Sequence, residues 1–240
     1  MPELRAALIE RLRFLAEIGV DALPRSRPAA VEVAPGAAIA TTVPPGRPSP
    51  AADALAALRE RIGDCHLCRL SASRSRIVFG VGNPDADLMF IGEAPGRDED
   101  LQGEPFVGKA GQLLDRMIAA IGWRREDVYI ANIVKCRPPD NRNPQADEME
   151  ACADFLRAQI DAVAPRVIVA LGKFATGALL GAEVAITRAR GQFRLVRGVP
   201  VMPTFHPAFL LRQYTAENRR LVYEDLLQVQ AMLETPRPDL

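Results

Sequence analysis

Lysine and histidine are scarce in this 240-residue chain, and its opposite charges cancel. Of the 30 basic residues only three are lysine, at positions 109, 135 and 173, and histidine occurs only at positions 66 and 206. With 30 acidic residues, the formal net charge is zero. This balance excludes a nucleic-acid binder that depends on bulk positive charge. A local basic face remains open, because arginine makes up the rest of the basic residues and binds phosphate in a bidentate manner.

The chain also lacks long apolar runs and familiar nucleotide-binding patterns. Its most apolar segments, such as 167–171, have the length of a strand rather than of a membrane span, and the first residues lack the order of a secretory signal. We therefore expect a cytoplasmic protein with no membrane contact. The glycine-rich segment 92–96 matches neither the Walker pattern nor the Gly-x-Gly-x-x-Gly turn, which predicts that no nucleotide cofactor is used.

Four cysteines are present, Cys65, Cys68, Cys136 and Cys152. Structural disulfides are rare in the cytosol, so metal ligation or plain burial is expected instead. One Cys-x-x-Cys pair followed by two dispersed cysteines differs from the two close pairs of a zinc ribbon. The spacing fits a cluster held between separate elements, as in a 4Fe-4S unit. For Cys152, which lies on an apolar helix stripe, burial as a small hydrophobic residue is the competing explanation.

Composition divides the chain into four segments. Leucine and isoleucine recur at helical spacing near the start, so residues 1–22 are expected to form a helical appendage. Residues 23–50 are rich in proline and alanine, which is typical of a linker. Residues 51–234 would form the main domain, and residues 235–240 a short tail.

Within residues 51–234, apolar strands and amphipathic helices alternate. The expected strands are 88–91, 128–134, 167–171 and 199–204, with 193–197 as a hairpin partner of the last. We expect one helix over about 109–121 and another over 216–233. A third helix would begin at Pro144, with Asn143 as its N-cap. This alternation predicts an α/β fold, in which three layers (α/β/α) surround a central, mostly parallel four-stranded sheet.

Polar residues follow three of these strands at their carboxyl ends, where open α/β sheets bind ligands. Glu93 and the acidic run 98–100 follow the first strand, Asn132 lies near the end of the second, and His206 follows the fourth. A lone asparagine in an apolar strand is costly to bury, which favours a binding role for Asn132. Main-chain N–H groups of the turn 92–96 would bind anions or carbonyl oxygens.

Several ordered motifs stand out along residues 55–232: Cys65-x-x-Cys68, the runs 92–100, 103–108 and 132–139, and His206-Pro207-Ala208. These motifs resemble those of the family 4, iron–sulfur uracil-DNA glycosylases of the uracil-DNA glycosylase superfamily. The resemblance implies hydrolysis of the N-glycosidic bond of deoxyuridine in DNA, which releases uracil and leaves an abasic site for base excision repair. A neighbouring family that bonds covalently to the abasic sugar has an extra histidine, which this chain lacks.

The resemblance implies a pocket for a base that has been flipped out of the DNA stack. Gly92, Glu93 and Ala94 would contact uracil, and Glu93 would face C5 and exclude the methyl group of thymine. Phe106 would stack on the base. Asn132 would accept from N3–H and donate to O4, a pattern that cytosine presents in reverse.

His206 and Glu99 are the implied catalytic residues. His206 would donate a hydrogen bond to uracil O2, where negative charge grows as the base leaves. Glu99 would align the attacking water, with Asp98 and Asp100 as neighbouring alternatives. Ala94 stands where other branches of the superfamily carry a water-activating aspartate, so the chain has no side-chain base at that position.

The resemblance also implies surfaces for DNA and for a cofactor. The candidates for an apolar wedge that fills the vacated stack are Phe209, Leu210, Leu211 and Arg212. The arginines expected to face phosphates are Arg188, Arg190, Arg194, Arg197, Arg212, Arg219 and Arg220. The implied ligands of a structural 4Fe-4S cluster are Cys65, Cys68, Cys136 and Cys152.

The expected partner is uracil-containing DNA, single- or double-stranded, bound by a monomer whose residues 1–22 are available to dock a repair partner. Two other functions stay open from the residues alone. An iron–sulfur electron carrier or redox regulator on a similar sheet would explain the cysteines, but it leaves Asn132 and His206 unexplained. A metal-stabilised DNA-binding module without catalysis leaves the same two residues unexplained.

Overall fold

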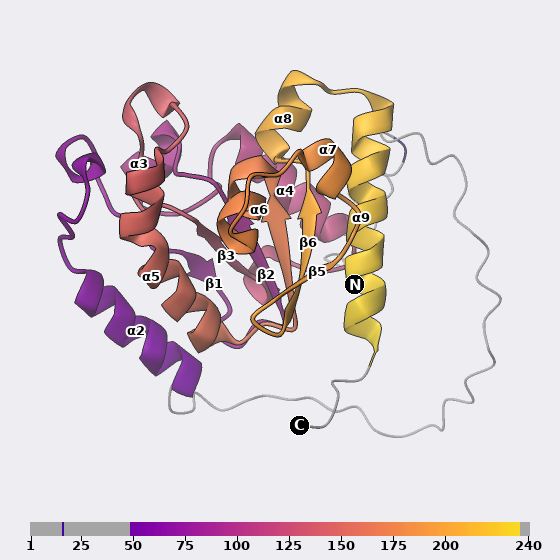
Figure 1. Cartoon of the computed structure of the whole chain (residues 1–240). Coiled ribbons are helices and arrows are strands. Elements are labelled where there is room, and N and C mark those ends of the chain that lie inside the picture. The colour runs from indigo at the N-terminus through magenta and orange to yellow at the C-terminus, as the bar shows by residue number, and fades with distance from the viewer. Residues whose placement is uncertain (1–15, 17–48, 236–240) are drawn as a thin grey trace, which may run out of the picture.

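The computed structural model describes residue 16 and residues 49–235 (Figure 1). Nearly all of the expected appendage (1–22) and linker (23–50), and the tail beyond residue 235, lie outside the described residues. The helices are α2 (Pro50–Ile62), α3 (Arg97–Gln102), α4 (Lys109–Ala120), α5 (Ala146–Val163), α6 (Gly172–Leu180), α7 (Ile186–Ala189), α8 (Pro207–Arg212) and α9 (Ala216–Glu234). The strands are β1 (Val81–Gly82), β2 (Leu88–Gly92), β3 (Tyr129–Asn132), β4 (Val167–Leu171), β5 (Arg194–Val196) and β6 (Val199–Thr204).

The strands form a six-stranded sheet in the order β1-β3-β2-β4-β6-β5. The four inner strands are parallel, and β1 and β5 each pair antiparallel at an edge. The predicted α/β fold with a mostly parallel sheet is confirmed, since the four expected strands form its centre. The sheet has six strands rather than four because β1 and β5 add an edge strand on each side. Strand β5 lies within the expected hairpin segment 193–197, whereas two-residue β1 is too short to show any periodicity. All four parallel strands end at the same edge, where ligands bind in such folds.

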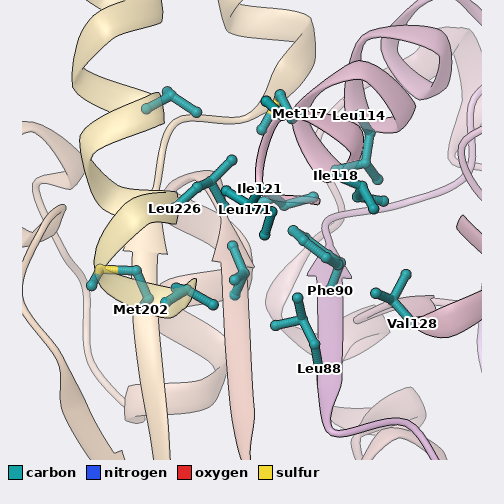
Figure 2. Packing of buried hydrophobic residues seen from close by; sticks show 14 of the residues in the cluster. Leu88, Phe90, Leu114, Met117, Ile118, Ile121, Val128, Leu171, Met202 and Leu226 are labelled. Atoms are coloured by element: carbon teal, nitrogen blue, oxygen red, sulfur yellow. The ribbon is translucent and has the colours of Figure 1, made fainter. Parts of the chain in front are cut away.

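Helices cover both faces of the sheet, and alternate residues of each strand pack against opposite layers (Figure 1). In β2, Leu88 and Phe90 pack with α4 and α9, while Met89 and Ile91 pack on the side of α2 and α5. Figure 2 shows the first of these clusters, with Phe90 beneath Ile118. Burial on both faces explains why these strands are continuously apolar in sequence.

Helix α5 begins later than expected. Instead of starting at Pro144 with Asn143 as cap, α5 begins at Ala146 and is capped by Gln145. Glu148 completes a capping box, because its Oε2 accepts from the Gln145 main-chain N–H at 2.8 Å. The residues before Gln145 are thereby left in a loop, which becomes part of the cavity described below.

Helices α2 and α3 are among those that were not expected. In α2, the Ser49 hydroxyl caps the first turn by accepting from the Ala52 N–H at 3.2 Å, with Pro50 at the first position. The acidic run 98–100 forms the first turn of α3, where the helix dipole favours negative charge. In residues 49–235, no helix combines the length and apolar character needed to cross a membrane.

Candidate active site

A cavity of about 330 Å³ lies at the carboxyl ends of the parallel strands. Seven predicted site residues line it together: Glu93, Ala94, Glu99, Phe106, Asn132, His206 and Arg212. They come from the turn after β2, from α3, from the loop before α4, from the end of β3, from the segment after β6 and from α8. Segments that are far apart in sequence therefore meet because the strands that carry them end side by side.

Asn132 is the last residue of β3 and is 2 % exposed. Its side-chain Oδ1 is buried and has no hydrogen-bond partner among the described residues. Asn132 pairs in register with Gly92 of β2, and a Cβ at Gly92 would lie 2.4 Å from Oδ1. Buried polar atoms normally find partners, so an orphaned amide oxygen at a cavity wall indicates a ligand-binding position.

Phe106 forms another wall of the cavity and lies 6 % exposed. Its ring centroid is 5.6 Å from that of His206, with 31° between the ring planes. The backbone of Phe106 is left-handed, with φ at 55°, which costs about 1 kcal/mol for a residue with a side chain. Gly111 makes this loop possible, because a Cβ there would lie 1.8 Å from the Phe106 carbonyl oxygen.

Glu99 holds the Phe106 loop in place. Its side chain is buried within α3, and its Oε1 accepts from the main-chain N–H groups of Val107 at 3.0 Å and Gly108 at 2.9 Å. A Cβ at Gly96 would lie 2.7 Å from Oε2, so the other carboxylate oxygen faces the turn after β2. The carboxylate thus joins two walls of the cavity.

Of the three acidic candidates, Glu99 alone lines the cavity. Asp98 is exposed at the start of α3. Asp100 is buried but turned elsewhere, since its Oδ1 accepts from the main-chain N–H of Ser75 at 2.8 Å. The geometry therefore favours Glu99 over its two neighbours for any role at the ligand.

His206 follows Phe205 after the end of β6 and caps α8. Its Nδ1 accepts from the Ala208 main-chain N–H at 3.1 Å, so in the neutral ring the proton lies on Nε2. Burial, together with the positive charge of Arg212, lowers the pKa of His206 to about 4. At neutral pH the imidazole is therefore an uncharged Nε2–H donor.

Glu93 follows β2 and lines the same cavity. Burial raises the pKa of its carboxyl group to about 7, although the positive charges of Lys173 and Arg212 act in the opposite direction. The carboxyl group is therefore poised between its neutral and charged forms at physiological pH. Such perturbed groups cluster at functional sites.

The four cysteines line a second, much smaller cavity. Arg74 reaches into it and donates to the Cys65 carbonyl at 2.6 Å and to the Cys136 Sγ at 3.5 Å. Burial raises the pKa of Cys136 to about 11 and also raises the pKa of Cys152. None of the four forms a disulfide. In the part of the chain that the structure describes, no three metal-binding side chains converge as they would on one ion.

The donor set of this second cavity fits an iron–sulfur group. Four cysteines from three separate segments line one cavity, and N–H groups of Arg74 and of the Lys135 main chain are directed at Cys136 and Cys152. Hydrogen bonds to cysteine sulfur are typical of such clusters.

Sequence reasoning missed the loop that leads into α5. Asn141, Arg142 and Asn143 line the first cavity opposite His206. Arg142 is fixed by a bidentate contact with Glu148, whose side chain is fully buried, with the shorter distance 2.6 Å. The one available signal was position, since the loop lies between two cysteines that were expected to bind the same group.

The wedge candidates on α8 divide by burial. Leu210 is 1 % exposed and belongs to the core beneath the sheet, so its expected role as a wedge is incompatible with its position. Phe209 packs on Phe205, with ring centroids 4.8 Å apart. Leu211 is 39 % exposed, and Arg212 is exposed beside the cavity. Phe209 is half-buried, so Leu211 and Arg212 are the two candidates that are exposed.

Some of the arginines expected to face DNA are engaged within the chain. Arg190 is largely buried and pairs with Asp225 at 2.5 Å. Arg197 lies 3.2 Å from Asp161. Arg194 and Arg188 are exposed, and Arg212 borders the cavity. Fewer of these arginines are therefore available to bind phosphate than the sequence suggests. Of those that are available, Arg212 borders the cavity.

Comparisons with known proteins agree with this arrangement. The family model described as the uracil DNA glycosylase superfamily matches residues 79–227. A type-4 uracil-DNA glycosylase of Thermotoga maritima is 47% identical over 177 residues, which cover 73% of this chain and 92% of the relative. Type-4 enzymes of Archaeoglobus fulgidus and Sulfurisphaera tokodaii are 43% and 41% identical and cover 75% and 77% of this chain and 93% and 87% of their own lengths. The chain belongs to the uracil-DNA glycosylase superfamily, among its type-4 members.

Proposed function

We infer that this protein hydrolyses the N-glycosidic bond of deoxyuridine in DNA, which releases uracil and leaves an abasic site. The observation that carries this inference is the meeting of Asn132 and His206 in one cavity, with Asn132 Oδ1 buried and without a partner among the described residues. The iron–sulfur carrier and the non-catalytic DNA-binding module explain the cysteines alone.

The cavity suits a flipped uracil. Asn132 Oδ1 would accept from uracil N3–H, and its Nδ2 would donate to O4, so each end of the amide is satisfied by uracil. Cytosine presents a donor and an acceptor in the reverse positions and would leave both ends unpaired. Phe106 would stack on the base, and Glu93 would stand at C5 against the thymine methyl group.

His206 would stabilise the departing base. Its neutral Nε2–H would donate to uracil O2, and that bond strengthens as negative charge develops on the leaving uracil. An imidazolium is unsuited to this arrangement, because it would lose the hydrogen bond from Ala208 to Nδ1. The low pKa of His206 therefore maintains the form that the reaction needs.

Glu99 would complete the site from the sugar side. Its Oε1 is committed to two main-chain N–H groups, which leaves Oε2 to orient water and to face the cationic sugar that forms as the bond breaks. Ala94 offers no base of its own. Glu99 is therefore both the support of the Phe106 loop and the proposed water-aligning residue.

We further propose that Cys65, Cys68, Cys136 and Cys152 hold a 4Fe-4S cluster. When bound, such a cluster would cross-link the segments that carry its four thiolates, which is a structural contribution. Two of these cysteines flank the loop with Asn141 and Arg142 that forms one wall of the cavity. Anchoring both ends of that loop keeps the wall in place.

The decisive experiment uses the full chain and an oligonucleotide that contains one deoxyuridine, with matched thymidine and deoxycytidine oligonucleotides. We expect free uracil and an alkali-labile abasic site from the first substrate alone, without any added reductant. The Asn132→Ala and His206→Ala variants should each lose activity by about 100-fold or more. If the wild-type protein releases no uracil, the proposed function is wrong.

The cofactor is tested separately on the same preparation. We expect iron and acid-labile sulfide near four of each per chain, broad visible absorbance, and loss of both in Cys68→Ser and Cys136→Ser. A colourless protein that contains zinc would contradict the proposed cluster. It would not bear on uracil excision, which the oligonucleotide assay tests separately.

A further inference from the structure

Lys135 is a buried cation between the two cavities. It is 1 % exposed, and its Nζ donates to the main-chain carbonyl of Asn132 at 2.7 Å and to Oε1 of Gln159 at 2.5 Å. Both partners are neutral oxygens, and within residues 49–235 the ammonium forms no ion pair with a carboxylate. A buried charge without a counter-charge is costly, so its retention calls for a physical explanation.

The cysteine site beside Lys135 would supply negative charge when its cysteines are ligated as thiolates. Lys135 lines that cavity, precedes Cys136 in sequence, and directs its main-chain N–H at Cys152. Thiolates in this cavity would lie close enough to stabilise the ammonium, whereas neutral thiols would not. The cation is thus placed to respond to whether the four cysteines are occupied as thiolates.

The other side of Lys135 is the base-recognition residue. β3 ends at Asn132, and the ammonium binds the carbonyl of that residue just before the chain leaves the sheet. Gln159, fully buried on α5, continues the network by donating to the Phe79 carbonyl at 2.8 Å and to the Tyr129 hydroxyl at 3.2 Å. A change in the position of Lys135 would therefore first displace the main-chain carbonyl of Asn132, and with it the Asn132 side chain.

We propose that Lys135 is a positioning residue that couples the four-cysteine site to uracil recognition by Asn132. The charge of the occupied cysteine site holds the ammonium, and the ammonium holds the Asn132 main chain. This inference rests on the proposed uracil excision. Coupling of this kind is reciprocal, so a base bound at Asn132 also perturbs the cysteine site.

The test compares three variants of the cluster-loaded protein. Lys135→Met removes the charge and both hydrogen bonds, Tyr129→Phe removes one buried hydrogen bond at the far end of the same network, and Arg157→Met removes an exposed cation from α5. We expect Lys135→Met to lower kcat on single-stranded uracil DNA by about tenfold or more, with KM changed less than about twofold. The other two variants should stay within about twofold of the wild type.

A spectroscopic measurement follows the coupling itself. Titration of free uracil into the wild-type protein should change the visible absorbance of the cluster, and Lys135→Met should abolish this change at equal iron content and equal melting temperature. A uracil-induced change that persists in Lys135→Met, or an equal loss of kcat in Tyr129→Phe, would overturn the proposal.

Two further outcomes keep the test decisive. If Lys135→Met does not fold or load iron, Gln159→Met is used, because it removes one partner of the ammonium and leaves the charge in place. A lower kcat with normal iron content then supports the proposal, and an unchanged kcat overturns it. If the wild-type protein itself releases no uracil, it is the proposed function that fails, whereas an active Lys135→Met protein contradicts this inference alone.

Discussion

Gly92 and Asn132 lie side by side at the ends of β2 and β3, and a methyl group on Gly92 would stand 2.4 Å from Asn132 Oδ1. The same methyl group would lie 2.4 Å from Cζ of Phe106. The Asn132 amide and the Phe106 ring are therefore packed around one position that has no side chain. This close approach gives the first prediction.

Replacing Gly92 with alanine should displace both the Asn132 amide and the Phe106 ring. We expect uracil release to fall by about 100-fold or more, because displacements of about 1 Å at a reacting site have effects of this size. The free energy of unfolding should fall by about 1–3 kcal/mol through overpacking. Gly181→Ala is the control, since it has open space and a positive φ and should cost stability without changing the rate. Single-turnover rates and thermal melting measure both effects.

Replacing Asn132 with leucine should separate stability from activity. The substitution removes a buried amide oxygen that has no hydrogen-bond partner within residues 49–235, so we expect the free energy of unfolding to rise by about 1 kcal/mol while uracil release is abolished. Gln159→Met removes a buried amide with satisfied hydrogen bonds and should lower stability by about 1–3 kcal/mol. Denaturant unfolding of the two variants measures both changes in the free energy of unfolding. A loss of stability in Asn132→Leu would show that the amide has an internal partner.

The pH dependence of His206 follows from its low pKa. Because the folded state holds the pKa near 4 and the unfolded state near its ordinary value of about 6.5, the unfolded chain binds the proton first as pH falls. Stability from this group is therefore complete above pH 6.5 and lost as pH falls toward 4, by about 3 kcal/mol at most. His206→Gln should remove this part of the pH dependence, and the wild-type rate should fall near pH 4 and not near 6.5.

Glu93 should make stability fall as pH rises, which is the opposite of the effect of His206. Its pKa of about 7 lies above that of an ordinary glutamate, so the folded state binds this proton more tightly and loses stability as pH rises through 7. In the proposed reaction, the carboxylate formed above pH 7 would place negative charge in the cavity from which uracil leaves as an anion. We expect the wild-type rate to fall by about tenfold per pH unit there and the Glu93→Gln rate to stay flat. A wild-type rate that is constant from pH 7 to 9 would contradict this.

Two neighbouring leucines of α8 should behave differently. Leu211→Ala should lower the rate on duplex DNA by about tenfold and leave the rate on single strands unchanged, as expected of a wedge that fills a vacated stack. Leu210→Ala should instead cost about 2–5 kcal/mol of stability, because Leu210 is part of the core. Equal effects of Leu211→Ala on both substrates would remove it as a wedge, and melting curves identify the core defect.

The sequence predicted most of what depends on local pattern. The four parallel strands are continuous apolar runs, and their order along the chain places Asn132 and His206 at one edge of the sheet. The Cys-x-x-Cys pair and the two dispersed cysteines also meet at one cavity. These features were predictable because period and spacing encode them directly.

The features that were missed depend on tertiary contacts. The acidic run 98–100 looks like a solvated turn, yet it is helical because Glu99 and Asp100 bind main-chain N–H groups of distant loops. Leu210 and Leu211 are the same type of residue, and only the docking of α8 on the core, which buries Leu210, distinguishes them. The loop with Asn141 and Arg142 reaches the cavity only because α5 begins at Ala146 and Glu148 fixes Arg142.

The two hydrogen bonds that Glu99 accepts from Val107 and Gly108 affect how enzymology at this position must be interpreted. They hold Phe106 in a backbone conformation that an aromatic residue does not favour by itself. A substitution that removes both side-chain oxygens, such as Glu99→Ala, therefore releases the aromatic ring as well as the carboxylate. A slow Glu99→Ala variant conflates lost stacking with lost hydration chemistry, and measuring affinity for the free base alongside turnover distinguishes the two.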